Sequence, residues 1–189
     1  DKVSVVRIPK KRDYMHIDTV FTQVKTNMWV LLGIFSKKHI KKLDSDPVER
    51  ALEKKNKEEQ ISIIQFHKDN ITKPIYFDNL EDLLKDISKN DLKCTEKVQF
   101  IYSGDNEFPF DAREQWTDSC NLLALKNGVV IGYDRNDRTL ESFKNNGFQI
   151  VPVQDLIQQL ENNTINIEDI KDTFITMPSA ELSRARGGF

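Results

Sequence analysis

The sequence has few cysteines and no long apolar run. Its 189 residues include only Cys94 and Cys120, which are too few for a disulfide framework and lack the spacing of a metal site. The longest apolar stretch, residues 28–35, has the length of a strand and falls far short of the roughly 20 residues that a membrane-spanning helix needs. We therefore expect no membrane segment, no bound metal and a reducing, cytoplasmic environment.

The sequence also has no large excess of positive or negative charge. The chain has 28 Lys and Arg residues against 30 Asp and Glu residues, a formal net charge of −2. No basic block with interleaved aromatic residues appears, which argues against nucleic acid as a partner. With 38% hydrophobic and 31% charged residues, the composition is typical of a soluble globular protein that can bury a core.

Strand and helix patterns alternate along the chain, which predicts a mixed α/β fold. Residues 15–24 and 28–35 are expected to form a hairpin. Strand, helix and strand follow one another over residues 61–102 and again over 129–153, which suggests repeated α/β modules. Two charged segments, near 46–60 and 154–175, resemble insertions, and the first of them is expected to be a helix from about residue 46 to 58. The remaining expected elements are strands at 3–8, 61–66, 97–102, 129–133 and 148–153, and helices at 79–89 and 137–146.

Residues 15–21 alternate apolar and polar side chains, as a half-buried strand does. On such a strand His16 and Asp18 would lie side by side on one face. A carboxylate in that position can bind a cation while the imidazole moves protons on and off it. The pattern alone favours a simpler interpretation, the solvated face of a strand, over a functional pair.

Four motifs, taken together and in order, extend the interpretation. They are Met15–Phe21, Arg113–Asn121, Tyr133–Asn136 with Thr139 just after it, and Glu181–Gly188. In identity, order and approximate spacing they resemble the C-terminal half of the bacterial arginine deiminases, which belong to the guanidino-group-modifying (amidinotransferase) superfamily. The resemblance covers most of the chain and is interrupted at the two charged segments.

The resemblance implies a fold and a reaction. The family fold is a five-fold pseudosymmetric α/β propeller of ββαβ modules, so residues 1–189 would form a single, incomplete propeller domain. The family reaction hydrolyses L-arginine to L-citrulline and ammonia without a cofactor. A cysteine thiolate attacks the guanidinium carbon, a histidine protonates the departing ammonia and then activates water, and two aspartates hold the guanidinium.

Carried onto this chain, the resemblance assigns three residues. His16 becomes the general acid and base, Asp18 becomes one of the guanidinium carboxylates, and Arg186 binds the α-carboxylate of the substrate. The family's cysteine falls two residues after the position that Phe189 matches, so the nucleophile is expected outside this chain. The expected partners are therefore L-arginine, the remaining half of the same protein and, through exposed apolar faces and strand edges, further copies of the chain.

Other candidates have simpler interpretations. Cys120 is expected to be a buried structural cysteine, Trp116 to pack in the core, and Arg113 and Glu114 to form a local ion pair. His39 and His67 match no motif and are expected to be surface or hydrogen-bonded histidines and not ligands. Two alternatives stay open: a related guanidino-modifying enzyme (a dimethylarginine hydrolase, an agmatine deiminase or an amidinotransferase) and a propeller-like binding protein without catalysis.

Overall fold

The computed structural model describes residues 1–14, 16–36 and 62–179. Contacts divide the chain into two compact units, which are described separately. The first unit comprises residues 1–15 and 34–95, and the second comprises residues 16–33 and 96–189. The expectation of one incomplete domain stays a prediction. The helix expected near residues 46–58 lies outside the described residues.

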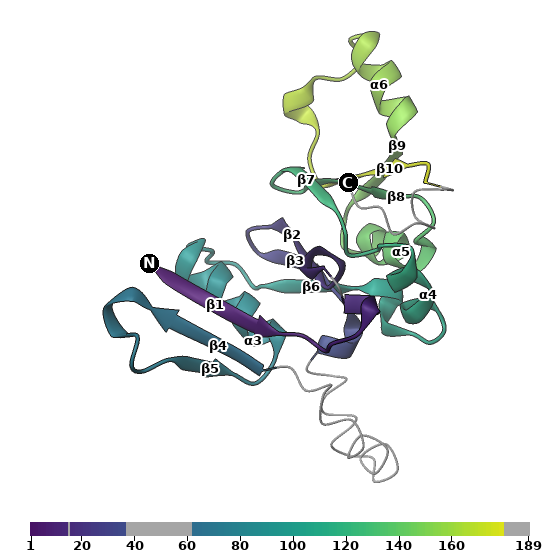
Figure 1. Cartoon of the computed structure of the whole chain (residues 1–189). Coiled ribbons are helices and arrows are strands. Elements are labelled where there is room, and N and C mark those ends of the chain that lie inside the picture. Colours follow the sequence, from purple (N-terminus) through teal and green to yellow (C-terminus); the bar gives the residue numbers. More distant parts are fainter. Residues whose placement is uncertain (15, 37–61, 180–189) are drawn as a thin grey trace. The chain divides into compact units, whose positions relative to one another are not determined.

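The first unit is an antiparallel sheet with a helix (Figure 1). Its strands are β1 (Lys2–Arg7), β4 (Ser62–His67) and β5 (Ile75–Phe77), with β4 in the middle. Helix α3 (Leu80–Asp86) continues into a π-helical turn, η6 (Ile87–Asp91). Asn79 caps the helix, because its side-chain oxygen accepts a hydrogen bond from Asp82 N at 3.0 Å. Short 3-10 turns lie at η1 (Arg12–Tyr14) and η5 (Lys68–Asn70), and a third, η3 (Gly33–Phe35), spans the boundary of the two units.

The second unit contains two sheets of similar construction (Figure 1). One has the order β2-β3-β6, and the other has the order β7-β8-β10-β9. In each, an antiparallel hairpin is followed by a strand that joins the second hairpin strand in parallel. The strands are β2 (Phe21–Lys25), β3 (Met28–Leu31), β6 (Gln99–Tyr102), β7 (Leu123–Lys126), β8 (Val129–Tyr133), β9 (Gln149–Pro152) and β10 (Thr173–Met177).

The two hairpins share an irregularity. The β2–β3 register shifts between Gln23 and Lys25, and the β7–β8 register shifts between Ala124 and Lys126. In both hairpins a bulge of one residue therefore precedes a two-residue turn. Strand, helix and strand do follow one another over residues 61–102 and 129–153, as expected. The unit that recurs in space is a hairpin with its parallel strand, because β4 and β6 belong to different sheets and β10 lies between β8 and β9.

Three helices pack around these sheets: α4 (Phe110–Trp116), α5 (Asp137–Asn145) and α6 (Val153–Glu161). Phe143 of α5 makes edge-to-face contacts with Phe148 and Phe174, at centroid distances of 5.2 and 4.8 Å. Leu156 of α6 joins a buried cluster with the strand residue Ile175. Three further turns are η2 (Ile17–Thr19), η7 (Ser103–Asn106) and η8 (Ile167–Asp169).

The mixed α/β architecture is confirmed, and the five-fold propeller stays a prediction. Helix α5 and strand β8 lie where the sequence predicts them. The strand expected over residues 15–24 was wrong at its start, because residues 17–19 form a 3-10 turn. The charged segment 154–175 contains the core-packed helix α6 and the beginning of β10, so this part of the segment belongs to the fold.

Candidate functional site

The structure places His16 and Asp18 together on one turn before β2. His16 precedes the 3-10 turn Ile17–Thr19, and both His16 and Asp18 are exposed. Arg186 lies outside the described residues. The roles of these three residues therefore stay predictions.

The turn forms because Thr19 binds the backbone of His16. The Thr19 hydroxyl donates to His16 O at 2.6 Å, and Thr19 N donates to the same oxygen at 3.2 Å. This local bonding competes with strand pairing, so the chain becomes extended only at Phe21. The apolar side chains of this segment are not all turned toward a core, as they would be on a half-buried strand, since Ile17 is 48% exposed.

A buried carboxylate organises the polar region that follows β6 and β8. Glu114 of α4 is fully buried, and its carboxylate accepts hydrogen bonds from Arg138 N and Thr139 N, both at 2.9 Å. It also accepts the Thr139 hydroxyl at 2.7 Å. Backbone amides in the first turn of an α-helix have no carbonyl partner within the helix, so a side chain must supply one. The helix dipole also favours a negative charge at this end of the helix. Glu114 thus caps α5 from a different helix.

The same helix end holds the strained turn η7. Three consecutive residues, Gly104, Asp105 and Asn106, have φ angles of 57°, 54° and 56°, which lie in the left-handed region. Gly104 N donates to the Thr139 hydroxyl at 2.9 Å, and the Ser142 hydroxyl donates to the Asp105 carboxylate at 3.1 Å. A Cβ at Gly104 would collide with backbone atoms of residues 110 and 111, so only glycine fits.

Two further polar pairs connect the segment after α4 to its neighbours. The hydroxyls of Ser103 and Ser119, both buried, lie 2.5 Å apart and share a hydrogen bond. The Asn136 side chain donates to Thr117 O at 3.1 Å and accepts the Thr117 hydroxyl at 2.5 Å. Ser103 and Asn136 follow the carboxyl ends of β6 and β8, each of which has a parallel neighbour. That edge of a parallel sheet is where ligands bind in many α/β proteins.

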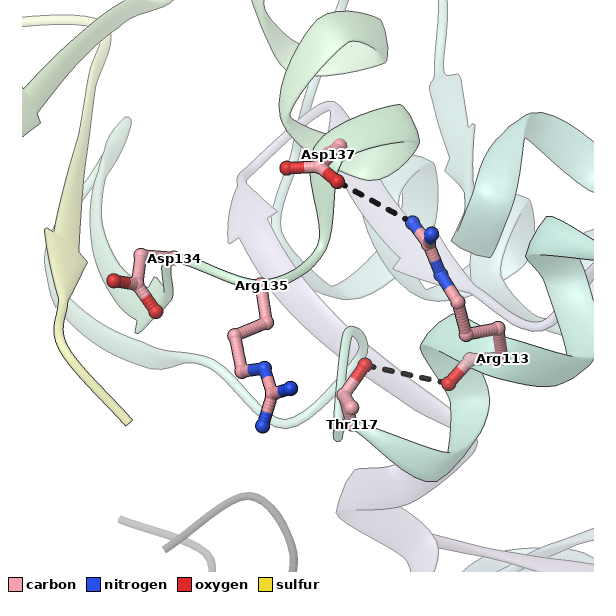
Figure 2. A pocket seen from close by; sticks show the side chains of 5 residues that line it. All are labelled: Arg113, Thr117, Asp134, Arg135 and Asp137. Carbon is pink, nitrogen blue, oxygen red and sulfur yellow. Dashed lines mark hydrogen bonds and ion pairs between the residues drawn. The ribbon is translucent and has the colours of Figure 1, made fainter. Parts of the chain in front are cut away.

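An open pocket of about 400 Å³ lies beside this network (Figure 2). Its lining carries charges of both signs, on Arg113, Asp134, Arg135 and Asp137, and the hydroxyl of Thr117. The Arg113 guanidinium contacts the Glu114 carboxylate at 2.9 Å and the Asp137 carboxylate at 3.4 Å. Its charge is therefore compensated by the protein itself. The size and charges of the pocket suit a small polar molecule. The same charged side chains also pair with one another, and this pairing gives them a structural role.

The two cysteines are not equivalent. Cys120 is 1% exposed, and Cys94 is half-buried. Burial raises the pKa of the Cys120 thiol well above its ordinary value, and the negative charge of Asp118 raises it further. Because the thiolate is the reactive form, Cys120 is suited to packing and not to nucleophilic attack. The expectation that Cys120 is a buried cysteine is confirmed.

Other sequence expectations have mixed outcomes. The ion pair of Arg113 and Glu114 is confirmed at 2.9 Å. Core packing of Trp116 was wrong, because that side chain is 53% exposed. The capping role of Glu114 was missed, because this side chain reaches α5 from α4 and no sequence pattern places the two helices together.

Among residues 1–14, 16–36 and 62–179, no three His, Cys, Asp or Glu side chains lie close enough together to hold a metal ion. In the same part of the chain, no helix has both the length and the apolar character that crossing a bilayer requires.

Comparison with known proteins agrees with the four motifs. The sequence model of the family "Arginine deiminase" matches residues 1–189. The arginine deiminase of Staphylococcus aureus strain MRSA252 is 30% identical over 155 residues, which is 80% of this chain and 32% of that protein. The arginine deiminases of strains JH9 and Newman match to the same extent. The chain thus spans about a third of the length of these relatives. It belongs to the arginine deiminase family.

Proposed function

We propose that this chain is part of an enzyme that hydrolyses the guanidino group of L-arginine to L-citrulline and ammonia. The observation that carries the proposal is the match of the family over residues 1–189. The relatives are named as arginine deiminases, and the chain spans a third of their length, so activity is proposed for the longer polypeptide.

A cysteine thiolate adds to the guanidinium carbon, and the C–N bond breaks as His16 gives a proton to the departing ammonia. The neutral imidazole then takes a proton from water, which adds to the same carbon and displaces the thiolate to release citrulline. Histidine suits both transfers because its pKa is near neutrality.

Asp18 and Arg186 bind the two ends of the substrate in this proposal. A guanidinium is planar and permanently charged, so a carboxylate such as Asp18 can bind it through two hydrogen bonds. Arginine binds a carboxylate in the same way, which suits Arg186 to the α-carboxylate. Exposure of both His16 and Asp18 supports the proposal, since a substrate can reach them.

The nucleophile in this proposal is supplied from outside the 189 residues. Cys120 is buried and its pKa is raised, and Cys94 matches no catalytic motif. The isolated chain should therefore form no citrulline from arginine. Citrulline formation by the isolated chain at a rate comparable to that of the polypeptide read from the gene on both sides of residues 1–189 would overturn this account.

Substitutions in that longer polypeptide test the roles. We expect His16→Asn to lower kcat about 10²- to 10⁴-fold, the usual range for a lost general acid and base. His67→Asn is the matched control, since His67 contacts Gln65 at 3.2 Å and belongs to no motif. An unchanged kcat in His16→Asn, or an equal loss in His67→Asn, would remove His16 from the mechanism.

Arg186 allows a test of the substrate. Agmatine has the guanidinium of arginine but no carboxylate. Arg186→Gln should therefore raise KM for arginine and leave KM for agmatine unchanged. A wild-type preference for agmatine or methylarginine over arginine would instead favour a related enzyme of the superfamily.

A further inference from the structure

The chain contains two Asn-Gly steps, Asn127-Gly128 and Asn146-Gly147. An asparagine before a glycine can deamidate, because the missing Cβ lets the glycine nitrogen approach the asparagine side chain closely. The glycine nitrogen loses its proton and bonds to Cγ of the asparagine, the side-chain amide leaves as ammonia, and a succinimide ring forms. Water then opens the ring to aspartate or isoaspartate, so the overall change consumes a water molecule and releases an ammonia molecule.

The first step is closed by hydrogen bonds to three separate segments. Gly128 is buried, its N–H donates to Val24 O at 2.9 Å, and its carbonyl accepts from Thr173 N at 2.9 Å. The side-chain oxygen of Asn127 accepts from Thr26 N at 2.9 Å. The attacking nitrogen is therefore released only when the first hairpin of the second unit separates from the second hairpin.

The second step is closed only by bonds within the last turn of α5. Gly147 N donates to Lys144 O at 3.0 Å, and the side-chain amide of Asn146 donates to Ser142 O at 2.8 Å. Both residues of the step are exposed. Apart from the chain neighbours of Gly147, no atom lies within 4 Å of the position that a Cβ would take there. Helix ends fray at little cost, so unwinding this turn frees the attacking nitrogen without separating the strands.

We propose that Asn146 is a modification site, which reacts with water in the folded chain to give aspartate and isoaspartate, and that Asn127 is protected until the second unit opens. Two observations carry the proposal. The bonds of one step stay within a single helix turn, whereas those of the other reach three segments. Gly147 is exposed, whereas Gly128 is buried.

The reaction would change the junction of α5 and β9. Either product replaces the amide that donates to Ser142 O with a carboxylate, and a negative charge is unfavourable at the C-terminal end of a helix. Isoaspartate also adds a methylene group to the backbone next to a close contact. There Phe148 N donates to Phe143 O at 3.1 Å, and the two rings pack at 5.2 Å. The modification should therefore loosen the attachment of α5 to its sheet.

Peptide mapping by mass spectrometry tests the proposal on the 189-residue chain, stored in mildly alkaline buffer. Trypsin cleaves after Lys126 and Lys144, so the two steps fall in different peptides. In the folded chain, we expect Asn146 to convert faster than Asn127 by a factor of about ten or more. In urea the two steps should convert at similar rates, because each is an asparagine followed by a glycine. The comparison thus separates protection by the fold from intrinsic reactivity.

A pair of variants connects the reaction to stability. Asn146→Gln should stop the conversion, because a glutamine must close a larger ring. Asn145→Gln is the matched control, since it changes the neighbouring exposed asparagine and keeps the Asn-Gly step. Storage should lower the urea midpoint of the wild type and of Asn145→Gln, but not that of Asn146→Gln. Circular dichroism of fresh samples reports whether each variant is folded.

The wild-type map alone can refute the proposal, whatever the variants do. Equal rates at the two steps in the folded chain, a faster reaction at Asn127, or no reaction at Asn146 would overturn it. An equal loss of stability on storage in Asn146→Gln and wild type would assign that loss to another change, and would overturn the effect on α5.

Discussion

Glu114 shows how one buried carboxylate can hold several elements of a fold together. Its two oxygens accept the Arg138 and Thr139 amides, the Thr139 hydroxyl and the Arg113 guanidinium. A buried carboxylate is costly unless its hydrogen bonds are satisfied, and here four donors satisfy it. These bonds hold α4 against α5, and Thr139 in turn holds α5 against the turn η7.

Glu114→Gln tests this role. The amide has the same shape, but its NH₂ group would face donors where an oxygen now accepts. We expect the free energy of unfolding to fall by about 2 kcal/mol, the typical effect of a lost charged hydrogen bond and an unpaired buried donor. Urea denaturation followed by circular dichroism measures the change.

Glu141→Gln is the matched control for that measurement. Glu141 lies on the same helix, α5, and pairs with Arg138 at 2.9 Å, but its side chain is 57% exposed. Exposed pairs contribute little, so the control should change the free energy of unfolding by less than about 0.5 kcal/mol. Equal effects of the two substitutions would show that the buried hydrogen bonds of Glu114 stabilise the fold no more than an exposed ion pair does.

At the scale of elements, the helices and strands that could be predicted are those whose position follows from a local sequence pattern. Helix α5 follows from its capping region and strand β8 from its apolar run, and both lie where expected. The turn at His16 was missed because the alternation of residues 15–21 also permits Thr19 to close a 3-10 turn. The Glu114 cap was missed because it joins two helices whose proximity only the fold determines.

In the first unit, salt bridges connect the edge strand β1 to helix α3 and the turn η6. Lys2 of β1 contacts Asp86 of α3 at 2.9 Å and Asp91 of η6 at 2.8 Å. Burial alone would raise the pKa of Asp86, but hydrogen bonds from Lys2 and Asn90 lower it below the ordinary 3.8. Burial alone would lower the pKa of Lys2, and its bonds to Asp91 and Asp86 raise it above 10.5.

These shifts predict how stability depends on pH. Since the folded pKa of Asp86 is lowered, its contribution is complete above pH 3.8 and is lost as the pH falls through the folded pKa. Since the folded pKa of Lys2 is raised, its contribution is complete below pH 10.5 and is lost as the pH rises through the folded pKa. We expect Lys2→Met to reduce the free energy of unfolding by up to about 1 kcal/mol at pH 7, because the groups are partly exposed.

Denaturant titrations of wild type and Lys2→Met at pH 3 and pH 7 measure this dependence. The difference between the two proteins should be smaller at pH 3, which lies below the ordinary pKa of 3.8, because Asp86 in the unfolded chain is then largely protonated. Lys68→Met is the control, since its pair with Asp1 spans 3.5 Å between side chains that are 71% and 85% exposed. A difference that is larger at pH 3 than at pH 7 would contradict the assignment.

At the scale of the whole molecule, the chain carries one cysteine in each compact unit. Cys94 lies in the first unit and is half-buried, and Cys120 lies in the second and is 1% exposed. Alkylation of a fully buried thiol requires an opening of the structure around it, because the reagent cannot reach the thiol and burial, which raises the pKa of Cys120, disfavours the reactive thiolate in the closed form. The two thiols therefore report separately on the two units.

We expect native Cys120 to react with iodoacetamide about a thousandfold more slowly than native Cys94, which corresponds to an opening free energy of about 4 kcal/mol. Mass spectrometry of Cys94→Ala and Cys120→Ala, each with one remaining thiol, assigns the rates. In urea, Cys120 should become reactive only when the second unit unfolds. Equal native rates would show that the structure around Cys120 opens freely, and with it the carboxylate cap and the hairpin pair that belong to the same unit.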